Sequence, residues 1–151
     1  MPQLLRYCCK QVCDARLGEE IAQETWLKLW AYRARYQPQG KFRVLLYTTA
    51  RNQCRSHARA AGRRSPWFSD LPAPTESTRA DAGTQLDALL ADENARRVQA
   101  AMTCLKPKLR EALLLRFDQD LDYSEIAAIV GRSESTVRSR IFHGLKKLRT
   151  H

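Results

Sequence analysis

The sequence predicts an all-α fold of two small helical domains joined by a flexible linker, the C-terminal one containing a helix-turn-helix. Apolar residues recur at helical spacing through most of the 151 residues, and no segment shows the apolar-polar alternation of a half-buried strand. One segment, 65–84, instead concentrates Pro, Ser, Thr, Gly and Asp, a composition typical of a tether. We therefore expect domains at 1–64 and 85–151, with a linker at 65–84.

The spacing of apolar residues predicts helices over 3–14, 18–35, 43–62, 85–104, 107–118, 123–130 and 134–149. The first carries the cluster Cys8, Cys9 and Cys13. Cys8 and Cys9 share helical spacing with Leu5 and Val12, which favours small core residues. A metal or redox site stays open as a second interpretation, although no Cys/His pair has zinc-ligand spacing. Five cysteines without an export signal argue against a disulfide framework.

The helix over 18–35 has two contrasting faces. At 100° per residue we place one set on the buried face: Ile21, Ala22, Trp26, Leu29 and Trp30. The opposite face carries Glu20, Gln23, Glu24, Leu27 and Lys28. A leucine among acids and an amide is either a protein-docking surface or a single exposed apolar residue, and the sequence alone leaves both open.

The helix over 43–62 is cationic on one side. Arg51, Arg55 and Arg59 recur every four residues, and the contrary face is Leu46, Ala50, Gln53, Cys54 and His57. His57 is therefore interpreted as a core histidine. The preceding loop, 36–42, interleaves aromatic rings, amides and a lysine, groups that stack on unpaired bases and hold phosphates.

The two helices over 123–130 and 134–149 surround a Gly131-Arg132-Ser133 turn, the arrangement of a helix-turn-helix. Asp122 and Glu125 fit a capping box, and Ser133 can cap the second helix. That helix should bury Val137, Ile141, Leu145 and Leu148. Its other face offers hydroxyls for phosphates and longer donors for base edges: Ser135, Thr136, Arg138, Ser139, His143 and Lys146. The alternative is an amphipathic helix with a solvated basic face.

The charge distribution favours a polyanion as partner. The chain has 26 Lys and Arg against 16 Asp and Glu, a net charge of +10. Residues 1–66 carry +9 and residues 99–151 carry +4, whereas residues 67–98 carry −3. Two basic blocks around an acidic connector fit a nucleic acid held at two places.

No run approaches the ~20 apolar residues of a membrane span and no signal peptide is visible, so we expect a cytoplasmic protein without membrane insertion.

Three blocks of sequence carry a resemblance to a known family. They are GEEIAQETWLKLW (18–30), GKFRVLLYTTARNQCRSHAR (40–59), and, after the Pro-rich tether, LKPKLREALLLRF (105–117) with DYSEIAAIVGRSESTVRSRIFHGLKKLR (122–149). In this order and spacing they resemble the extracytoplasmic-function (ECF) group of the bacterial sigma-70 family. Two departures are visible: Leu45 stands where the family commonly has Trp, and few residues precede the first block, as if the N-terminus were truncated.

The resemblance implies a sigma factor that binds core RNA polymerase and directs promoter recognition, melting and transcription initiation. It implies polymerase docking by Glu20, Gln23, Glu24 and Leu27. It implies capture of the downstream (−10) element by Lys41, Phe42, Arg43, Tyr47, Arg51, Asn52 and Arg55. The helix-turn-helix residues listed above would read the upstream (−35) element.

The same resemblance implies a separate anti-sigma partner and no catalytic residue, metal or cofactor. Two rival functions stay open. A free-standing DNA-binding regulator would use the C-terminal motif alone, and an enzyme or metal sensor would use the cysteine cluster.

Overall fold

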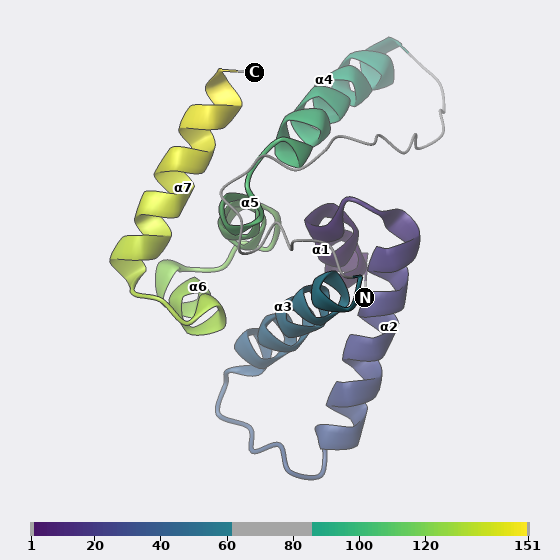
Figure 1. Cartoon of the computed structure of the whole chain (residues 1–151), viewed down its shortest axis with the longest axis vertical. Coiled ribbons are helices and arrows are strands. Elements are labelled where there is room, and N and C mark those ends of the chain that lie inside the picture. The colour runs from purple at the N-terminus through teal and green to yellow at the C-terminus, as the bar shows by residue number, and fades with distance from the viewer. Residues whose placement is uncertain (1, 62–85, 151) are drawn as a thin grey trace.

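A computed structural model describes residues 2–61 and 86–150, with side chains in the second range from residue 93 onward. These residues form α-helices and one π-helical turn (Figure 1). In chain order they are α1 (Pro2–Val12), α2 (Ala15–Tyr32), α3 (Phe42–Ala60), α4 (Leu86–Thr103), α5 (Pro107–Leu113), η1 (Leu114–Asp118), α6 (Tyr123–Val130) and α7 (Glu134–Arg149). The predicted all-α fold is confirmed. The predicted linker, 65–84, lies outside the described residues.

The helix predicted over 107–118 differs at its C-terminal end. Its α-helical part ends at Leu113, and the chain continues as the wider π-helical turn η1. There the N–H of Gln119 donates to the carbonyl of Leu114 at 3.1 Å, five residues back. The next turn widens further, because Leu121 N–H donates to Leu115 at 3.0 Å. The apolar spacing of this segment predicts a continuous α-helix and contains no sign of the wider turn.

The caps of the helix-turn-helix are confirmed. Asp122 accepts from the Glu125 N–H at 2.8 Å, and the Glu125 carboxylate accepts from the Asp122 N–H at 3.0 Å, so the capping box is complete. Gly131 ends α6 in the left-handed region, with φ 66°. Ser133 then caps α7 by accepting from the Thr136 N–H at 3.3 Å. The turn is thus fixed by local interactions at each of its steps.

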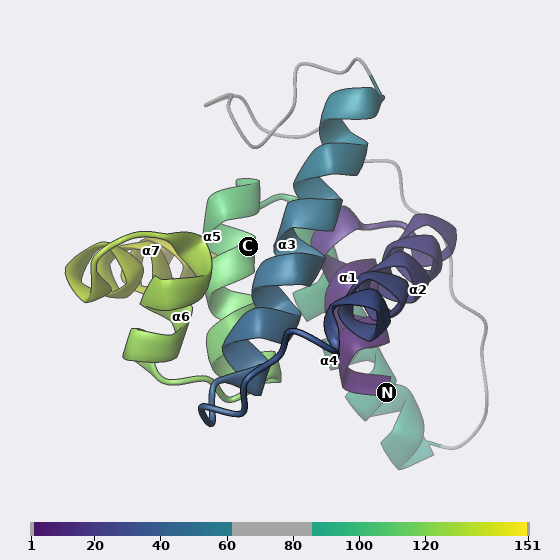
Figure 2. The ribbon, with the colours of Figure 1, turned by 90° about the horizontal axis from the view of Figure 1, so that it is seen from below.

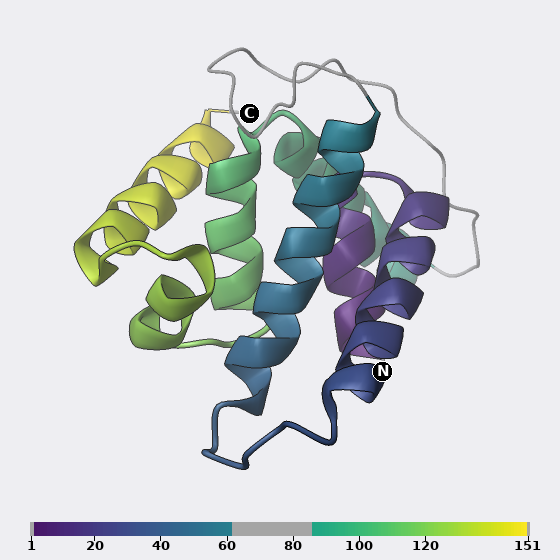
Figure 3. The same cartoon turned by 60° about the horizontal axis from the view of Figure 1, so that its bottom comes forward.

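The core of the N-terminal half lies where α1, α2 and α3 meet. Tyr7, Ile21 and Ala50 are fully buried there, one from each helix. The other half buries Leu115 and Val137 among α5, η1, α6 and α7. Figures 2 and 3 show α3 between the α1–α2 pair and α5, so the two halves lie directly against each other. The division into separate domains stays a prediction.

Two residues predicted in the core are exposed. Trp30 of α2 is 67% exposed, with the Arg33 guanidinium 4.2 Å from its ring centre. Trp30 lies nine positions after the buried Ile21. At 3.6 residues per turn this is two and a half turns, so the two side chains point to opposite sides of the helix. Leu145 of α7 is also exposed, because the buried face passes instead through Gly144, against which Leu113 packs. The predictions for Trp30 and Leu145 were therefore wrong.

No helix among the described residues combines the length and apolar character that crossing a bilayer requires.

Candidate nucleic-acid interface

The outer face of α7 presents most of the residues predicted to read DNA. Ser135, Ser139, His143 and Lys146 are exposed and Thr136 is half-buried. Val137 and Ile141 anchor the opposite side of the helix in the core. This gives a rigid helix with hydroxyls, a histidine and a lysine on one side, the chemistry of a major-groove reader.

Arg138 lies at the edge of that face and is held by neighbours. Its guanidinium is 4.5 Å from the ring centre of Tyr123 and 3.7 Å from the Glu134 carboxylate. The Arg116 guanidinium lies 5.0 Å from the same ring. Tyr123 was not among the predicted residues, and its only sequence signal is an aromatic residue at the start of α6. The side chain of Arg138 remains 61% exposed despite these contacts.

The start of α3 presents a second candidate surface. Lys41, Phe42 and Asn52 are exposed. The ring of Phe42 meets that of Tyr36 edge to face, with centres 5.9 Å apart. An exposed aromatic pair beside cations can stack on an unpaired base.

Three other predicted residues of α3 contact the C-terminal half: Tyr47 is buried, Arg51 is half-buried and Arg43 is exposed. The Arg51 Nε donates to Glu111 Oε1 at 2.6 Å. Tyr47, 3% exposed, donates its hydroxyl to the Gln119 carboxamide oxygen, and Arg43 donates to the Gln119 carbonyl. The family resemblance assigns all three to the −10 element, and that assignment stays a prediction. Arg43 is exposed like the adjacent Phe42, whereas Tyr47 and Arg51 are covered by the C-terminal half.

Glu111 is the acidic centre of this contact. It is fully buried, and burial raises the pKa of its carboxyl group, while the charge of Arg51 lowers it. Arg55, half-buried on the same side of α3, has its pKa lowered by burial and by the neighbouring positive charges of Arg51 and Arg59. Sequence reasoning missed Glu111, although an acid inside the apolar run LREALLLRF was a signal of a buried pair.

The outer face of α2 is the predicted docking surface. Leu27 is 69% exposed, Glu20 and Gln23 are exposed, and Glu24 is half-buried. Beside them opens a pocket of about 460 Å³ between α2 and α3, lined by Glu24, Leu27, Lys28, Gln53, Ser56, His57 and Ala60. An exposed leucine at the rim of a hollow is more consistent with docking than with an isolated surface residue.

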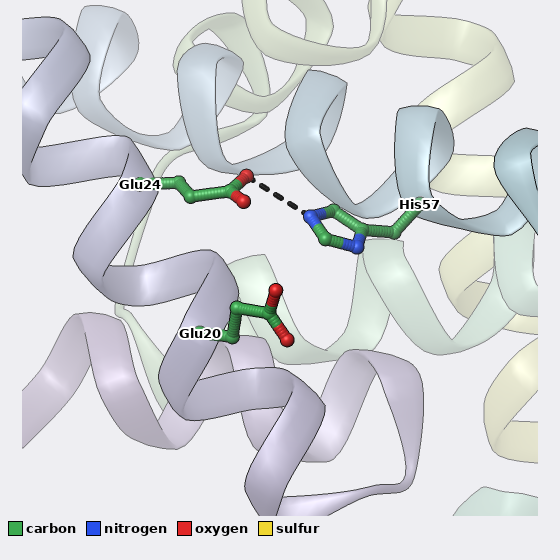
Figure 4. A group of neighbouring side chains, drawn as sticks. All are labelled: Glu20, Glu24 and His57. Carbon is green, nitrogen blue, oxygen red and sulfur yellow. Dashed lines mark hydrogen bonds and ion pairs between the residues drawn. The ribbon is translucent and has the colours of Figure 1, made fainter.

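One wall of the pocket is a hydrogen-bonded group of side chains. Figure 4 shows its Glu24–His57 contact, with Glu20 beside it. His57 Nε2 lies 2.9 Å from Glu24 Oε2, which also accepts from Gln53 at 2.8 Å. Lys28 in turn donates to Gln53 at 2.7 Å. His57 therefore lies at the pocket wall, half-buried, rather than deep in the core. Its ligand atom and those of Glu20 and Glu24 lie within 4.8 Å of one another, a set that could hold a divalent cation.

The cysteines of the first helix have the character of structural thiols. Cys8 and Cys54 are both buried and interact with each other. The hydrogen bond with Cys8 is the largest cause that raises the pKa of the Cys54 thiol, and burial is the second. Burial likewise raises the pKa of Cys9 and of Cys13. A raised pKa disfavours the thiolate, the form that binds metals and reacts with oxidants.

Comparison with known families covers most of the chain. Residues 1–64 match the family described as Sigma-70 region 2, and residues 95–148 match Sigma-70, region 4.

Several curated relatives are similar over nearly the whole of this chain and about three quarters of their own length. The chain is 32% identical to the RNA polymerase sigma-H factor of Pseudomonas aeruginosa, covering 93% of this chain and 75% of that protein. It is 34% identical to the ECF RNA polymerase sigma factor SigD of Mycobacterium tuberculosis, covering 98% and 71%. A solved structure, the sigma factor RpoE with the anti-sigma factor NepR from Bartonella quintana, has a TM-score of 0.77 at 23% identity, covering 99% and 89%. That structure has the same fold.

Proposed function

The chain belongs to the extracytoplasmic-function group of the bacterial sigma-70 family, and we propose that it uses two domains, 1–64 and 85–151, to hold a promoter. As a sigma factor it binds RNA polymerase and directs promoter recognition and transcription initiation. The N-terminal domain docks on the core enzyme through Glu20, Gln23, Glu24 and Leu27, and it captures the −10 element. The C-terminal domain reads the −35 element.

The capped helix-turn-helix is the observation that carries this division. Its turn is fixed by the capping box and by Gly131, and its second helix exposes a hydroxyl-rich, cationic face. A positioned helix of this kind supports sequence-dependent contact with duplex DNA, whereas net charge alone would support only non-specific binding.

Three further parts of the proposal follow from family membership. The chain contributes no catalytic chemistry of its own, it acts in the cytoplasm, and a separate anti-sigma protein holds it inactive. The exposed docking face of α2, which a free-standing DNA-binding regulator would not need, supports this function over that rival. Direct binding to core polymerase separates the two.

Arg138→Ala tests the −35 assignment in reconstituted transcription with purified core enzyme on a promoter library. We expect a loss of about 5- to 150-fold that depends on the upstream sequence, because a bidentate base contact contributes roughly 1–3 kcal/mol. Arg97→Ala, which removes an exposed arginine of α4, is the control and should leave the preference unchanged. An equal loss on every promoter would restrict Arg138 to a phosphate contact.

Phe42→Ala tests the −10 assignment. We expect promoter opening to slow by about 5- to 150-fold, with a much smaller effect on initial duplex binding, because stacking on an unpaired base contributes roughly 1–3 kcal/mol. Permanganate footprinting of unpaired thymines measures opening directly. Phe42→Tyr keeps the ring and should open the promoter normally. Unchanged opening in the alanine variant would exclude the stacking role.

A further inference from the structure

One group of potential metal ligands lies between α2 and α3. Glu20 and Glu24 come from α2 and His57 comes from α3, and Figure 4 shows the three side chains pointing toward one another. Each residue offers one ligand atom, and these atoms all lie within 4.8 Å of one another. Two carboxylates and an imidazole supply three of the donor atoms that a small divalent cation needs.

The positions of the three donors follow from helix geometry and packing. Glu20 and Glu24 are four residues apart, so their side chains lie one turn apart on the same face of α2. His57 lies 33 positions from Glu24 in the chain and meets it because α3 packs against α2. No ligand spacing is therefore visible in the sequence, and the group becomes apparent only in the fold.

Neighbouring side chains hold Glu24 in the orientation that a ligand would need. Its Oε2 atom accepts from Gln53 Nε2 at 2.8 Å and lies 2.9 Å from His57 Nε2. Lys28 Nζ donates to Gln53 Oε1 at 2.7 Å, which directs the amide nitrogen of Gln53 at Glu24. Partners of this kind orient a metal ligand from outside the coordination sphere, and their loss costs about 10- to 100-fold in metal affinity.

The charge of the group also favours a cation. Residues 1–66 carry a net charge of +9. Even so, within residues 2–61 and 93–150 no lysine or arginine forms an ion pair with Glu20 or Glu24, and Lys28 bonds to Gln53 instead. Two carboxylates four residues apart on one helix repel each other. A divalent cation bound between them removes this repulsion.

The donor set favours a transition metal over Mg²⁺ or Ca²⁺, because those ions prefer oxygen ligands and an imidazole nitrogen is a typical donor to Zn²⁺. Tetrahedral Zn²⁺ places such donors about 3.4 Å apart. Glu24 and His57 are already 2.9 Å apart, and the exposed Glu20 can rotate to complete the arrangement. The adjoining pocket leaves room for water in the remaining coordination position.

We propose that Glu20, Glu24 and His57 form a binding site for a divalent transition metal such as Zn²⁺, and that the occupied site blocks docking to core RNA polymerase. The blocking effect rests on the docking role proposed for Glu20 and Glu24. Coordination holds both carboxylates against α3 and neutralises their charge, so neither can pair with cationic groups of a partner. Metal binding and docking therefore exclude each other.

Isothermal titration calorimetry of the full chain with zinc chloride tests the site. His57→Ala and Glu20→Gln should each bind zinc at least about tenfold more weakly than the wild type. Glu19→Gln is the matched control, because Glu19 is an exposed neighbour on α2 outside the group and its replacement makes the same change in net charge. It should bind zinc like the wild type. An excess of Mg²⁺ should not displace the zinc.

Absorption spectroscopy with Co²⁺ in place of Zn²⁺ identifies the donor atoms. Thiolate ligands give an intense charge-transfer band in the near ultraviolet, which nitrogen and oxygen ligands do not. We expect no such band at one equivalent of Co²⁺. Thermal unfolding followed by circular dichroism verifies that the variants are folded, and Glu20→Gln, at an exposed position, decides the outcome if His57→Ala is not.

Fluorescence anisotropy of the labelled chain with purified core enzyme measures the blocking effect. At a zinc concentration ten times its dissociation constant, the wild type and Glu19→Gln should bind the core enzyme about tenfold more weakly than in zinc-free buffer. The affinity of His57→Ala should not respond to zinc. Comparing each chain with itself in this way separates the effect from any action of zinc on the polymerase.

Equal zinc affinity of the wild type, His57→Ala and Glu20→Gln would overturn the inference, as would a thiolate band with Co²⁺. Zinc binding at the site without any change in core affinity would overturn the blocking effect. Failure of the docking role has a different signature, normal core binding by both Glu20→Gln and Leu27→Ala in zinc-free buffer. That result removes the blocking effect, whereas the loss of zinc binding in His57→Ala would still support the metal site.

Discussion

Leu27→Asp should abolish association with core RNA polymerase while leaving the chain folded. Leu27 is 69% exposed, so its replacement disturbs little packing within the protein. On docking, the variant would lose the burial of a leucine, roughly 1.5–3 kcal/mol, and would bring an unpaired carboxylate into the interface beside Glu20 and Glu24. Together these costs correspond to a loss in affinity of at least about a hundredfold.

Fluorescence anisotropy of the labelled chain with purified core enzyme measures this loss, and thermal unfolding followed by circular dichroism verifies the fold. Leu27→Met, which keeps an apolar side chain of similar volume, is the matched control and should bind with nearly normal affinity. Tight binding by the aspartate variant would remove α2 from the docking surface.

The helix-turn-helix could be predicted closely because its signals are local. Asp122 and Glu125 are three residues apart, and Gly131 and Ser133 flank the turn, so each cap depends only on neighbours in sequence. The observed bounds of α6 and α7 equal the predicted ones. Where the interactions that form a structural feature join residues within about one helical turn, the sequence is sufficient to predict that feature.

The partners of α3 could not be predicted in the same way. A repeat of arginines every four residues defines a face of the helix, but it does not say whether solvent, DNA or protein covers that face. The partner of Arg51 is Glu111, sixty positions further along the chain, and its burial depends on how the halves pack. Helical periodicity contains no information about such long-range pairs, so the internal contact becomes visible only in the structure.

The errors at Trp30 and Leu145 have a related cause. In both helices the buried face differs from the one that the apolar pattern suggested, because small residues define part of it: Gly18 and Thr25 in α2, and Gly144 in α7. A search for large apolar residues overlooks positions where the approach of another element requires a small one.

Gly18→Ala should be the most destabilising single substitution at such a position. A Cβ atom added at Gly18 would lie 2.5 Å from the Cα and 2.6 Å from the backbone nitrogen of Cys9, where α2 meets α1. Backbone atoms cannot rotate away, so the two helices would have to separate. We expect a net loss of about 3 kcal/mol or more in the free energy of unfolding, even though alanine favours a helix by about 1 kcal/mol over glycine.

Gly144→Ala provides the comparison, because there an added Cβ would lie 2.9 Å from a methyl carbon of Leu113, the end of a flexible side chain. A small rotation of Leu113 relieves that contact, and the gain in helix propensity offsets part of the remaining strain. Thermal unfolding followed by circular dichroism should show a midpoint roughly 6–12 °C lower for Gly18→Ala and nearly unchanged for Gly144→Ala. Equal midpoints would mean that α1 and α2 can move apart at little cost, and the close crossing at Cys9 would then not be what positions the docking face of α2.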